Sequence, residues 1–167
     1  PADLPGLADL AWASFPCQDL SLAGNGAGLQ GARSGTFWPF WTHILSLAQE
    51  GRAPRVIALE NVCGALTSHN GDDFAAIGSA LASAGYLFGA IVIDAVHFVP
   101  QSRPRLFIIG VQRGARINQQ LICSQPETHW HPSTLIEAEK KLNKVAREAW
   151  IWWHLPAPSL RNSTFFE

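Results

Sequence analysis

The strongest constraint on the fold is an alternation of short apolar runs with segments of helical periodicity. Four apolar runs have the length and the β-branched or aromatic content of buried strands, at 10–15, 55–60, 86–96 and 106–111. Apolar side chains recur at helical spacing over 37–49 and again over a segment from Asp72 to Gly85. The order strand, helix, strand, helix, strand, strand predicts an α/β fold with helices packed on the faces of a sheet.

The connection between the last two predicted strands indicates their relative direction. About nine residues without a helical pattern join the runs at 86–96 and 106–111. A parallel crossover needs roughly a dozen residues or more, so these two strands are predicted to form an antiparallel hairpin. The rest of the sheet is expected to be parallel, which makes it a mostly parallel sheet. Residues 133–150 are expected to form one further helix with an exposed charged face.

Composition limits the class of protein. The chain has 167 residues, which corresponds to one domain of ordinary size. Hydrophobic residues make up 47% of it and charged residues 15%, so the chain can bury enough apolar surface to fold. A formal net charge of -1 gives no bulk electrostatic attraction to phosphate. No apolar run approaches the roughly 18 residues of a membrane span, and the first residues lack the pattern of a signal peptide.

Two further features of the composition concern the origin of the chain. Three cysteines cannot close a disulfide framework, which favours reduced thiols and a cytoplasmic protein. The chain contains no Met and begins at Pro1, so we expect it to be a piece of a longer polypeptide.

The first candidate site is the segment Phe15-Pro16-Cys17-Gln18, directly after the first predicted strand. Ligand and catalytic groups collect at the carboxyl ends of the strands in α/β sheets. A thiol at that position can act as a nucleophile when it is ionised. The alternative is a buried structural cysteine, which the residues around Cys17 do not exclude.

The second candidate site is Glu60-Asn61-Val62, at the end of the second predicted strand. If the first two strands are parallel neighbours, their carboxyl ends place Cys17 and Glu60 at the same edge of the sheet. A carboxyl group there can exchange a proton with a substrate. The alternative is a turn or helix-capping carboxylate.

The third candidate site is Gln101-Ser102-Arg103-Pro104-Arg105, which leads into the last predicted strand. In an extended segment Arg103 and Arg105 project on the same side, because side chains alternate. Guanidinium groups suit phosphates, or a carbonyl oxygen that gains negative charge. The alternative is a pair of solvated surface arginines, although two prolines make this connection rigid.

These three motifs, in this order and at these element ends, resemble the DNA cytosine-5 methyltransferase family. The similarity extends over about 9–167 and is strongest at 15–38, 56–63 and 99–111. It implies a partial Rossmann-like methyltransferase fold. It also implies that residues 1–167 are a single domain, the central fragment of a catalytic domain. The glycine motif for the cofactor, the target-recognition region and the later motifs of the family are not found in the sequence.

The resemblance also implies roles for individual residues. Cys17 would attack carbon 6 of a cytosine rotated out of DNA, and a methyl group from S-adenosylmethionine would then pass to carbon 5. Glu60 would contact N3 and the exocyclic amine, and Arg105 would hold the O2 carbonyl with Arg103 nearby. One wall of the cofactor site would be formed by Phe15, Pro16 and Phe37. The residues expected to contact the DNA substrate are Gln18, Ser21, Arg33, Asn61 and Gln101.

The family also suggests a biological setting. We expect a cytoplasmic protein, bacterial in origin, with a place in restriction–modification. We expect the isolated chain to bind S-adenosylmethionine weakly and to methylate poorly or not at all. DNA is the expected partner, and the motifs do not separate DNA from RNA.

Other readings of the sequence remain open. One is a non-catalytic remnant that binds nucleic acid, or that pairs with a second copy or a complementing chain through apolar edges. Another is a cysteine hydrolase in which Cys17 acts with His43, His69 or His97. The G-x-G-x-x-G pattern at 26–31 lies some ten residues beyond its strand, so its glycines are interpreted as hinges. The spacings of Cys63, Cys123 and the later histidines fit no compact zinc pattern, and no metal is expected.

Overall fold

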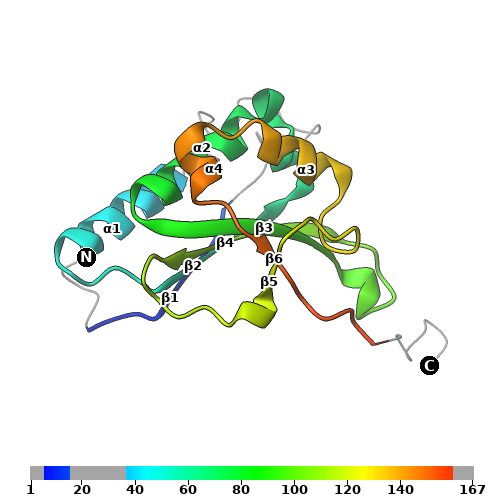
Figure 1. The fold of residues 1–167 in the computed structure, drawn as a ribbon, viewed down its shortest axis with the longest axis horizontal. Coiled ribbons are helices and arrows are strands. Elements are labelled where there is room, and N and C mark those ends of the chain that lie inside the picture. Colours follow the sequence, from blue (N-terminus) through cyan, green and yellow to red (C-terminus); the bar gives the residue numbers. More distant parts are fainter. Residues whose placement is uncertain (1–5, 16–36, 160–167) are drawn as a thin grey trace.

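A four-stranded sheet forms the centre of the protein, and helices cover one of its faces (Figure 1). The structure, a computed structural model, describes residues 6–15 and 37–159. The strands of this sheet are β1 (Leu10–Ser14), β2 (Val56–Val62), β3 (Tyr86–Asp94) and β4 (Pro104–Gln112). All four coincide with the apolar runs predicted from the sequence, to within a few residues at their ends.

The strand order is β1-β2-β4-β3. β1 and β2 are parallel, with register pairs from Leu10–Val56 to Ser14–Glu60. β4 lies between β2 and β3 and is antiparallel to both. The predicted hairpin of the last two strands is therefore confirmed, but the prediction of a mostly parallel sheet is wrong. One reversed strand inserted between two others makes two of the three ladders antiparallel.

The helices α1 (Phe37–Gln49) and α2 (Asp72–Ser83) lie on one face of this sheet, as their apolar periodicity predicts. Their buried side chains meet the inward side chains of the strands in one large core. The side chains in it that are less than 2% exposed include Phe37, Phe74, Ile77, Leu81, Ile57, Leu59, Phe88 and Leu106. Tyr86 also reaches into this layer and donates from its hydroxyl to the carbonyl of Pro54 at 2.7 Å.

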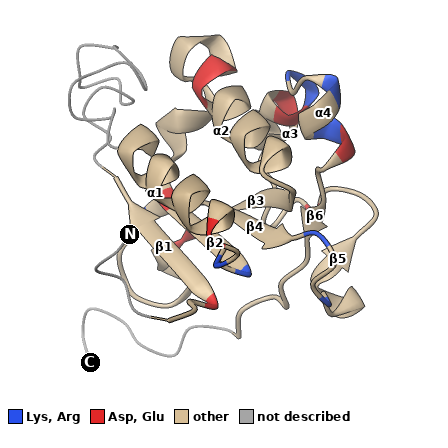
Figure 2. Ribbon diagram, turned by 90° about the vertical axis from the view of Figure 1, so that its left-hand side faces the viewer, with Lys and Arg blue, Asp and Glu red and all other residues tan. Residues whose placement is uncertain are grey.

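The single helix predicted over 133–150 is wrong, because the segment is divided into α3 (Ser133–Lys140) and α4 (Lys144–Glu148). Asn143 causes the break. Its Oδ1 accepts the N–H of Ala146 at 2.9 Å, which caps a new helix, and its Nδ2 donates to Ser79 of α2 at 2.8 Å. The predicted charged face is present, and Figure 2 shows charged residues gathered on α3 and α4.

A smaller apolar cluster occupies the opposite face of the sheet. Ile91 and Val111 of the sheet pack there against Trp130 and Trp153. Short elements surround it: β5 (Ile122–Cys123), which pairs with β6 (Trp152–Trp153), and the 3-10 turn η6 (Gln119–Leu121). Two more 3-10 turns, η3 (Cys63–Leu66) and η5 (Ala95–His97), follow the ends of β2 and β3, and η4 (Ser68–Gly71) leads into α2.

The outer edge of β3 is covered by the chain that follows α4. The N–H of Phe88 donates to the carbonyl of Ala149 at 2.9 Å, and the N–H of Ile151 donates to the carbonyl of Phe88 at 2.8 Å. Gly89 permits this approach, because a Cβ at that position would clash with the carbonyl oxygen of Ile151. Trp153 is 5% exposed there, and Trp150 and Trp152 are half-buried against the core.

Candidate active site

The carboxyl ends of β1 and β2 lie side by side at one edge of the sheet. Ser14, the last residue of β1, is paired in register with Glu60, as predicted for parallel neighbours. β4 runs in the opposite direction, so it begins at this same edge. Arg105 is paired there with Val62 of β2 and with Ile93 of β3. The structure thus brings the second and third sequence motifs together.

Glu60 and Arg105 form an ion pair at this edge. Nε of Arg105 lies 3.1 Å from Oε1 of Glu60, and the two side chains are 21% and 24% exposed, respectively. Nη1 of Arg105 also donates to the carbonyl oxygen of Pro104 at 2.9 Å. Partial burial strengthens such a pair relative to one in open solvent. The carboxylate and the guanidinium are therefore held in fixed positions while both keep surface that a ligand can reach.

Gln101 and Arg103 precede β4, and both are exposed. The N–H of Gln101 donates to the carbonyl of Val99 at 2.7 Å. The N–H of Arg103 donates to Oδ1 of Asp94 at 2.6 Å. These hydrogen bonds fix the backbone of the connection between β3 and β4 just before β4 begins.

Asn61 differs from Glu60 in the face of the strand that it occupies. Successive side chains of a strand alternate, so Asn61 shares the helix-covered face with Ile57 and Leu59. It is 5% exposed, and its Oδ1 accepts the N–H of Val62 at 2.8 Å. Its buried Nδ2 has no partner among the residues that the structure describes. Direct contact between the Asn61 side chain and a substrate stays a prediction.

Two of the residues predicted to bind the cofactor are packed in the core. Phe37 is fully buried and Phe15 is 9% exposed, and their ring centroids lie 5.8 Å apart. Phe37 also stacks on Trp41 with a centroid distance of 5.9 Å. The contact of these rings with the cofactor stays a prediction. The remaining predicted residues, Pro16, Cys17, Gln18, Ser21 and Arg33, lie outside the described residues.

Two residues at the edge were not singled out for this site by sequence reasoning. Asp94 ends β3 and accepts hydrogen bonds from both ends of the following connection. Cys63 follows β2, and burial raises the pKa of its thiol, an effect that the nearby Arg105 charge partly offsets. Nothing in the sequence sets Asp94 or Cys63 apart for this site, because the bonds of Asp94 depend on the register of its strand.

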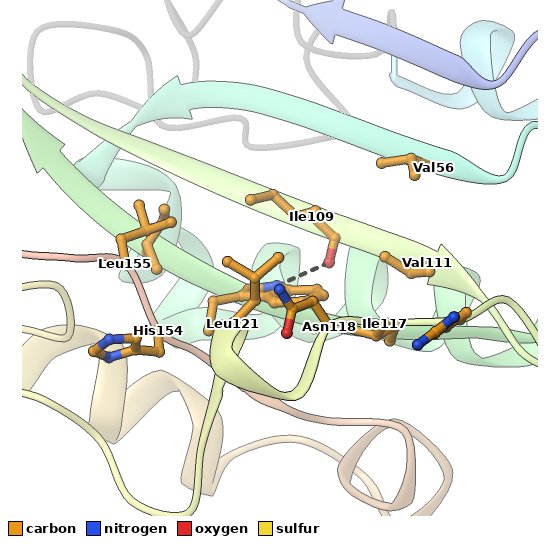
Figure 3. Close-up of a pocket in the computed structure, with 11 residues that line it drawn as sticks. Val56, Ile109, Val111, Ile117, Asn118, Leu121, His154 and Leu155 are labelled. Atoms are coloured by element: carbon orange, nitrogen blue, oxygen red, sulfur yellow. Dashed lines mark hydrogen bonds between the residues drawn. The ribbon is translucent and has the colours of Figure 1, made fainter.

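A cavity of about 310 Å³ lies elsewhere, on the face of the sheet opposite α1 and α2. Figure 3 shows its apolar lining, which includes Val56, Ile109 and Val111 of the sheet and Leu155. Of the predicted site residues within 6–15 and 37–159, none lines it. Over 6–15 and 37–159, no three potential metal-ligating side chains are grouped, and no helix in these ranges could cross a membrane.

The comparisons with known proteins agree with the sequence motifs. The profile of the family described as C-5 cytosine-specific DNA methylase matches residues 1–162. The chain therefore belongs to this family.

Two bacterial relatives show how much of such a protein is present. The chain is 33% identical over 111 residues to the Type II methyltransferase M.HaeII of Haemophilus aegyptius. It is 37% identical over 110 residues to the Type II methyltransferase M.Bsp6I of Bacillus sp. strain RFL6. These matches cover 66% and 65% of this chain and 33% of each relative. The chain thus spans about a third of the length of the curated relatives that it matches.

A solved structure supports the fold. A methyltransferase of Entamoeba histolytica, EhMeth, superposes with a TM-score of 0.52 at 20% sequence identity. The match covers 66% of this chain and 34% of that one. At this identity it supports a shared α/β fold with a mixed sheet and nothing more specific.

Proposed function

We propose that residues 1–167 are the central part of the catalytic domain of a DNA cytosine-5 methyltransferase. The reaction is the transfer of a methyl group from S-adenosylmethionine to carbon 5 of cytosine. The observation that carries the proposal is the 3.1 Å contact of Glu60 with Arg105 at the edge where β1 leads toward Cys17. A proton donor and a carbonyl clamp side by side are what addition to a cytosine ring requires.

Each residue has a distinct part in this mechanism. The Cys17 thiolate forms a bond to carbon 6 of the ring, and the electron pair of the C5–C6 double bond moves toward carbon 5. Glu60 takes up a proton from solvent and gives it to N3, and Arg105 binds the O2 oxygen as negative charge develops there. Once carbon 5 carries the methyl group, a water molecule takes its proton, the sulfur–carbon bond breaks to restore the thiolate, and N3 returns its proton to Glu60.

The base must leave the DNA duplex before these groups can reach it. Rotation out of the stack costs a few kcal/mol, which contacts to the phosphates and to the vacated space have to offset. We assign those contacts to Gln18, Ser21, Arg33 and Gln101, with Arg103 beside the base. Gln101 and Arg103 are exposed, which such contacts need.

The methyl donor has weaker support from the described residues. S-adenosylmethionine would supply an electrophilic methyl group, but Phe37 is fully buried and Phe15 is 9% exposed. Their part in one wall of the cofactor site stays a prediction, and no step is assigned to them. Pro16 stays as the third predicted contact.

A chimera tests the proposal. The matched 111 residues of M.HaeII are replaced by those of this chain, and the purified chimera is incubated with S-adenosylmethionine and DNA containing 5-fluorocytosine. Fluorine at carbon 5 cannot leave as a proton does, so the sulfur–carbon bond should persist as a covalent complex. Cys17→Ser should abolish it, and Cys63→Ser, a matched change at a second cysteine of the site edge, should not.

A second variant tests the role of the carboxyl group. Glu60→Gln should slow formation of the complex by about 100-fold or more, because the proton for N3 is lost. A folded chimera without any covalent complex would favour the non-catalytic remnant. A complex that survives Cys17→Ser would contradict the assigned nucleophile.

The same proposal includes the setting of the reaction. Relatives named Type II methyltransferases favour DNA as the substrate and a role in restriction–modification. Cys63 and Cys123 are free thiols, which suits the reducing cytoplasm of a bacterium.

A further inference from the structure

The Asp94 carboxylate joins the two ends of the connection between β3 and β4. Its Oδ1 accepts the N–H of Val96 at 3.0 Å and the N–H of Arg103 at 2.6 Å. Its Oδ2 accepts the hydroxyl of Ser102 at 2.8 Å. One side chain therefore bonds to the start and to the end of the segment that carries Gln101 and Arg103.

The backbone alone does not supply this closure. Hydrogen-bonded pairs alternate along an antiparallel ladder, and beyond the pair of Asp94 with Pro104 the bonding pair is Ala95 with Arg103. The N–H of Ala95 donates to the carbonyl of Arg103, but at a longer 3.3 Å. The shortest bond across the open end of the hairpin is the one from Arg103 to the carboxylate. The Arg103 N–H thus bonds to the Asp94 carboxylate, while the Ala95 carbonyl accepts from the N–H groups of Phe98 and Val99.

The closure lies next to the ion pair of the candidate site. Arg105 is paired with Ile93, one register position from Asp94, and its Nε lies 3.1 Å from Glu60. A shift of the 95–103 connection would move Arg103 and turn the first residues of β4. A displacement of about 1 Å at a catalytic group can cost a large factor in rate.

From this geometry we propose that Asp94 is a positioning residue, which holds the 95–103 connection so that Arg103 and Arg105 face the substrate beside Glu60. The inference rests on the proposed function for its effect on catalysis. Its structural part, the placement of Arg105 by Asp94, stands independently. The hydrogen bonds also hold the pKa of Asp94 below its usual value, and the bond from the Val96 N–H has the largest effect. The carboxylate is therefore ionised at neutral pH.

Two substitutions at position 94 separate positioning from charge. Asp94→Ala removes all three hydrogen bonds. Asp94→Asn keeps an Oδ1 that can accept from Val96 and Arg103, and its amide can donate to the Ser102 hydroxyl. A role in positioning predicts that Asn rescues what Ala loses.

Asn118 provides a matched control. Its Oδ1 accepts the N–H of Gln120 at 3.0 Å, the same two-residue turn that Asp94 makes with Val96. Asn118→Ala therefore removes a similar local bond in a connection away from Glu60 and Arg105.

The first readout is spectroscopic and uses the 167-residue chain. The NMR signal of the Arg105 Nε–H reports on its ion pair, and Glu60→Gln gives the position of that signal without the carboxylate. Asp94→Ala should move the signal toward the Glu60→Gln position, while Asp94→Asn and Asn118→Ala leave it unchanged. A signal that stays at the wild-type position in Asp94→Ala would overturn the proposal.

The second readout is the rate of covalent complex formation by the chimera. Asp94→Ala should slow it by roughly 10- to 100-fold, whereas Asp94→Asn and Asn118→Ala stay near the wild-type rate. Equal rates for Asp94→Ala and Asn118→Ala would contradict a catalytic effect. If the unmodified chimera forms no complex, the proposed function fails, and the Arg105 signal still decides whether Asp94 positions that side chain.

Discussion

His131 makes the stability of the fold depend on pH. Its side chain is 1% exposed, Nδ1 accepts the N–H of Glu127 at 2.8 Å, and the ring packs edge-on against Trp152. Burial lowers the pKa of His131 from the ordinary 6.5, and its bond and charge contacts with Glu127 only partly oppose this. The imidazole therefore stays neutral in the folded protein at a pH where the unfolded chain is already protonated.

The sign of the effect follows from proton linkage. Above pH 6.5 neither state binds a proton at this site, so His131 contributes no pH dependence. Below that value the unfolded state binds more protons, and the free energy of unfolding should fall by up to about 1.4 kcal/mol per pH unit until the lower folded-state pKa is reached.

Urea denaturation between pH 7.5 and about 5 measures this change in the free energy of unfolding. His131→Gln should flatten the profile, and His43→Gln, at an exposed position on α1, should not. Identical profiles for the two variants would exclude His131 as the cause.

At the scale of elements, Gly89 of β3 decides whether the chain after α4 can pack against the sheet. A Cβ at this position would meet the Ile151 carbonyl and lie 3.0 Å from the Trp153 ring. Gly89→Ala should destabilise the protein by about 2 kcal/mol, because backbone cannot move aside as a flexible side chain can. Hydrogen exchange should show loss of protection at the Ile151 N–H, which bonds to Phe88.

Gly114 offers the control for this change. Its φ is +88° and a Cβ there would have nothing within 4 Å, so Gly114→Ala tests backbone strain without a clash. It should cost about 1 kcal/mol and leave the protection of Ile151 intact. Unchanged protection of Ile151 in Gly89→Ala would refute the account of the packing.

These elements also show what local sequence information can predict. Strands and the helices α1 and α2 follow from apolar periodicity, and the antiparallel hairpin follows from the length of its connection. The position of β4 between β2 and β3 does not follow from the sequence, because an apolar run does not indicate which strands it pairs with. The break before α4 depends on a contact of Asn143 with Ser79, which is distant in sequence.

The same distinction applies to the candidate site. Adjacent parallel strands predicted that Glu60 would lie at the carboxyl edge next to the end of β1, and the register confirms that placement. Asn61 is buried on the face of β2 opposite to that of Glu60, and the alternation of side chains along a strand is enough to predict this. The hydrogen bonds of Asp94 could not be predicted in this way, since they depend on the register of β3 with β4.

At the scale of the whole molecule, the two faces of the sheet are covered unequally. α1 and α2 cover one face, whereas Leu10 and Trp12 of β1 are 53% and 55% exposed on the other. Trp12 packs only partly on Phe107, with a ring centroid distance of 6.1 Å. Parallel strands are ordinarily covered on both faces. The expected meeting of these apolar residues with a second copy or a complementing chain stays a prediction.

The burial of Phe37 bears on whether this chain can bind S-adenosylmethionine. Isothermal titration of the 167-residue chain with S-adenosylmethionine should show no saturable binding up to about 1 mM, weaker than roughly -4 kcal/mol. The physical reason is that Phe37, one of the residues predicted to form a wall of the cofactor site, is fully buried among core side chains. Phe37→Ala should accordingly cost about 3–5 kcal/mol of stability, measured by urea denaturation. Intact M.HaeII is the positive control for the titration. Micromolar binding by this chain, lost in Phe37→Leu without a matching loss of stability, would show that Phe37 serves the ligand rather than the core.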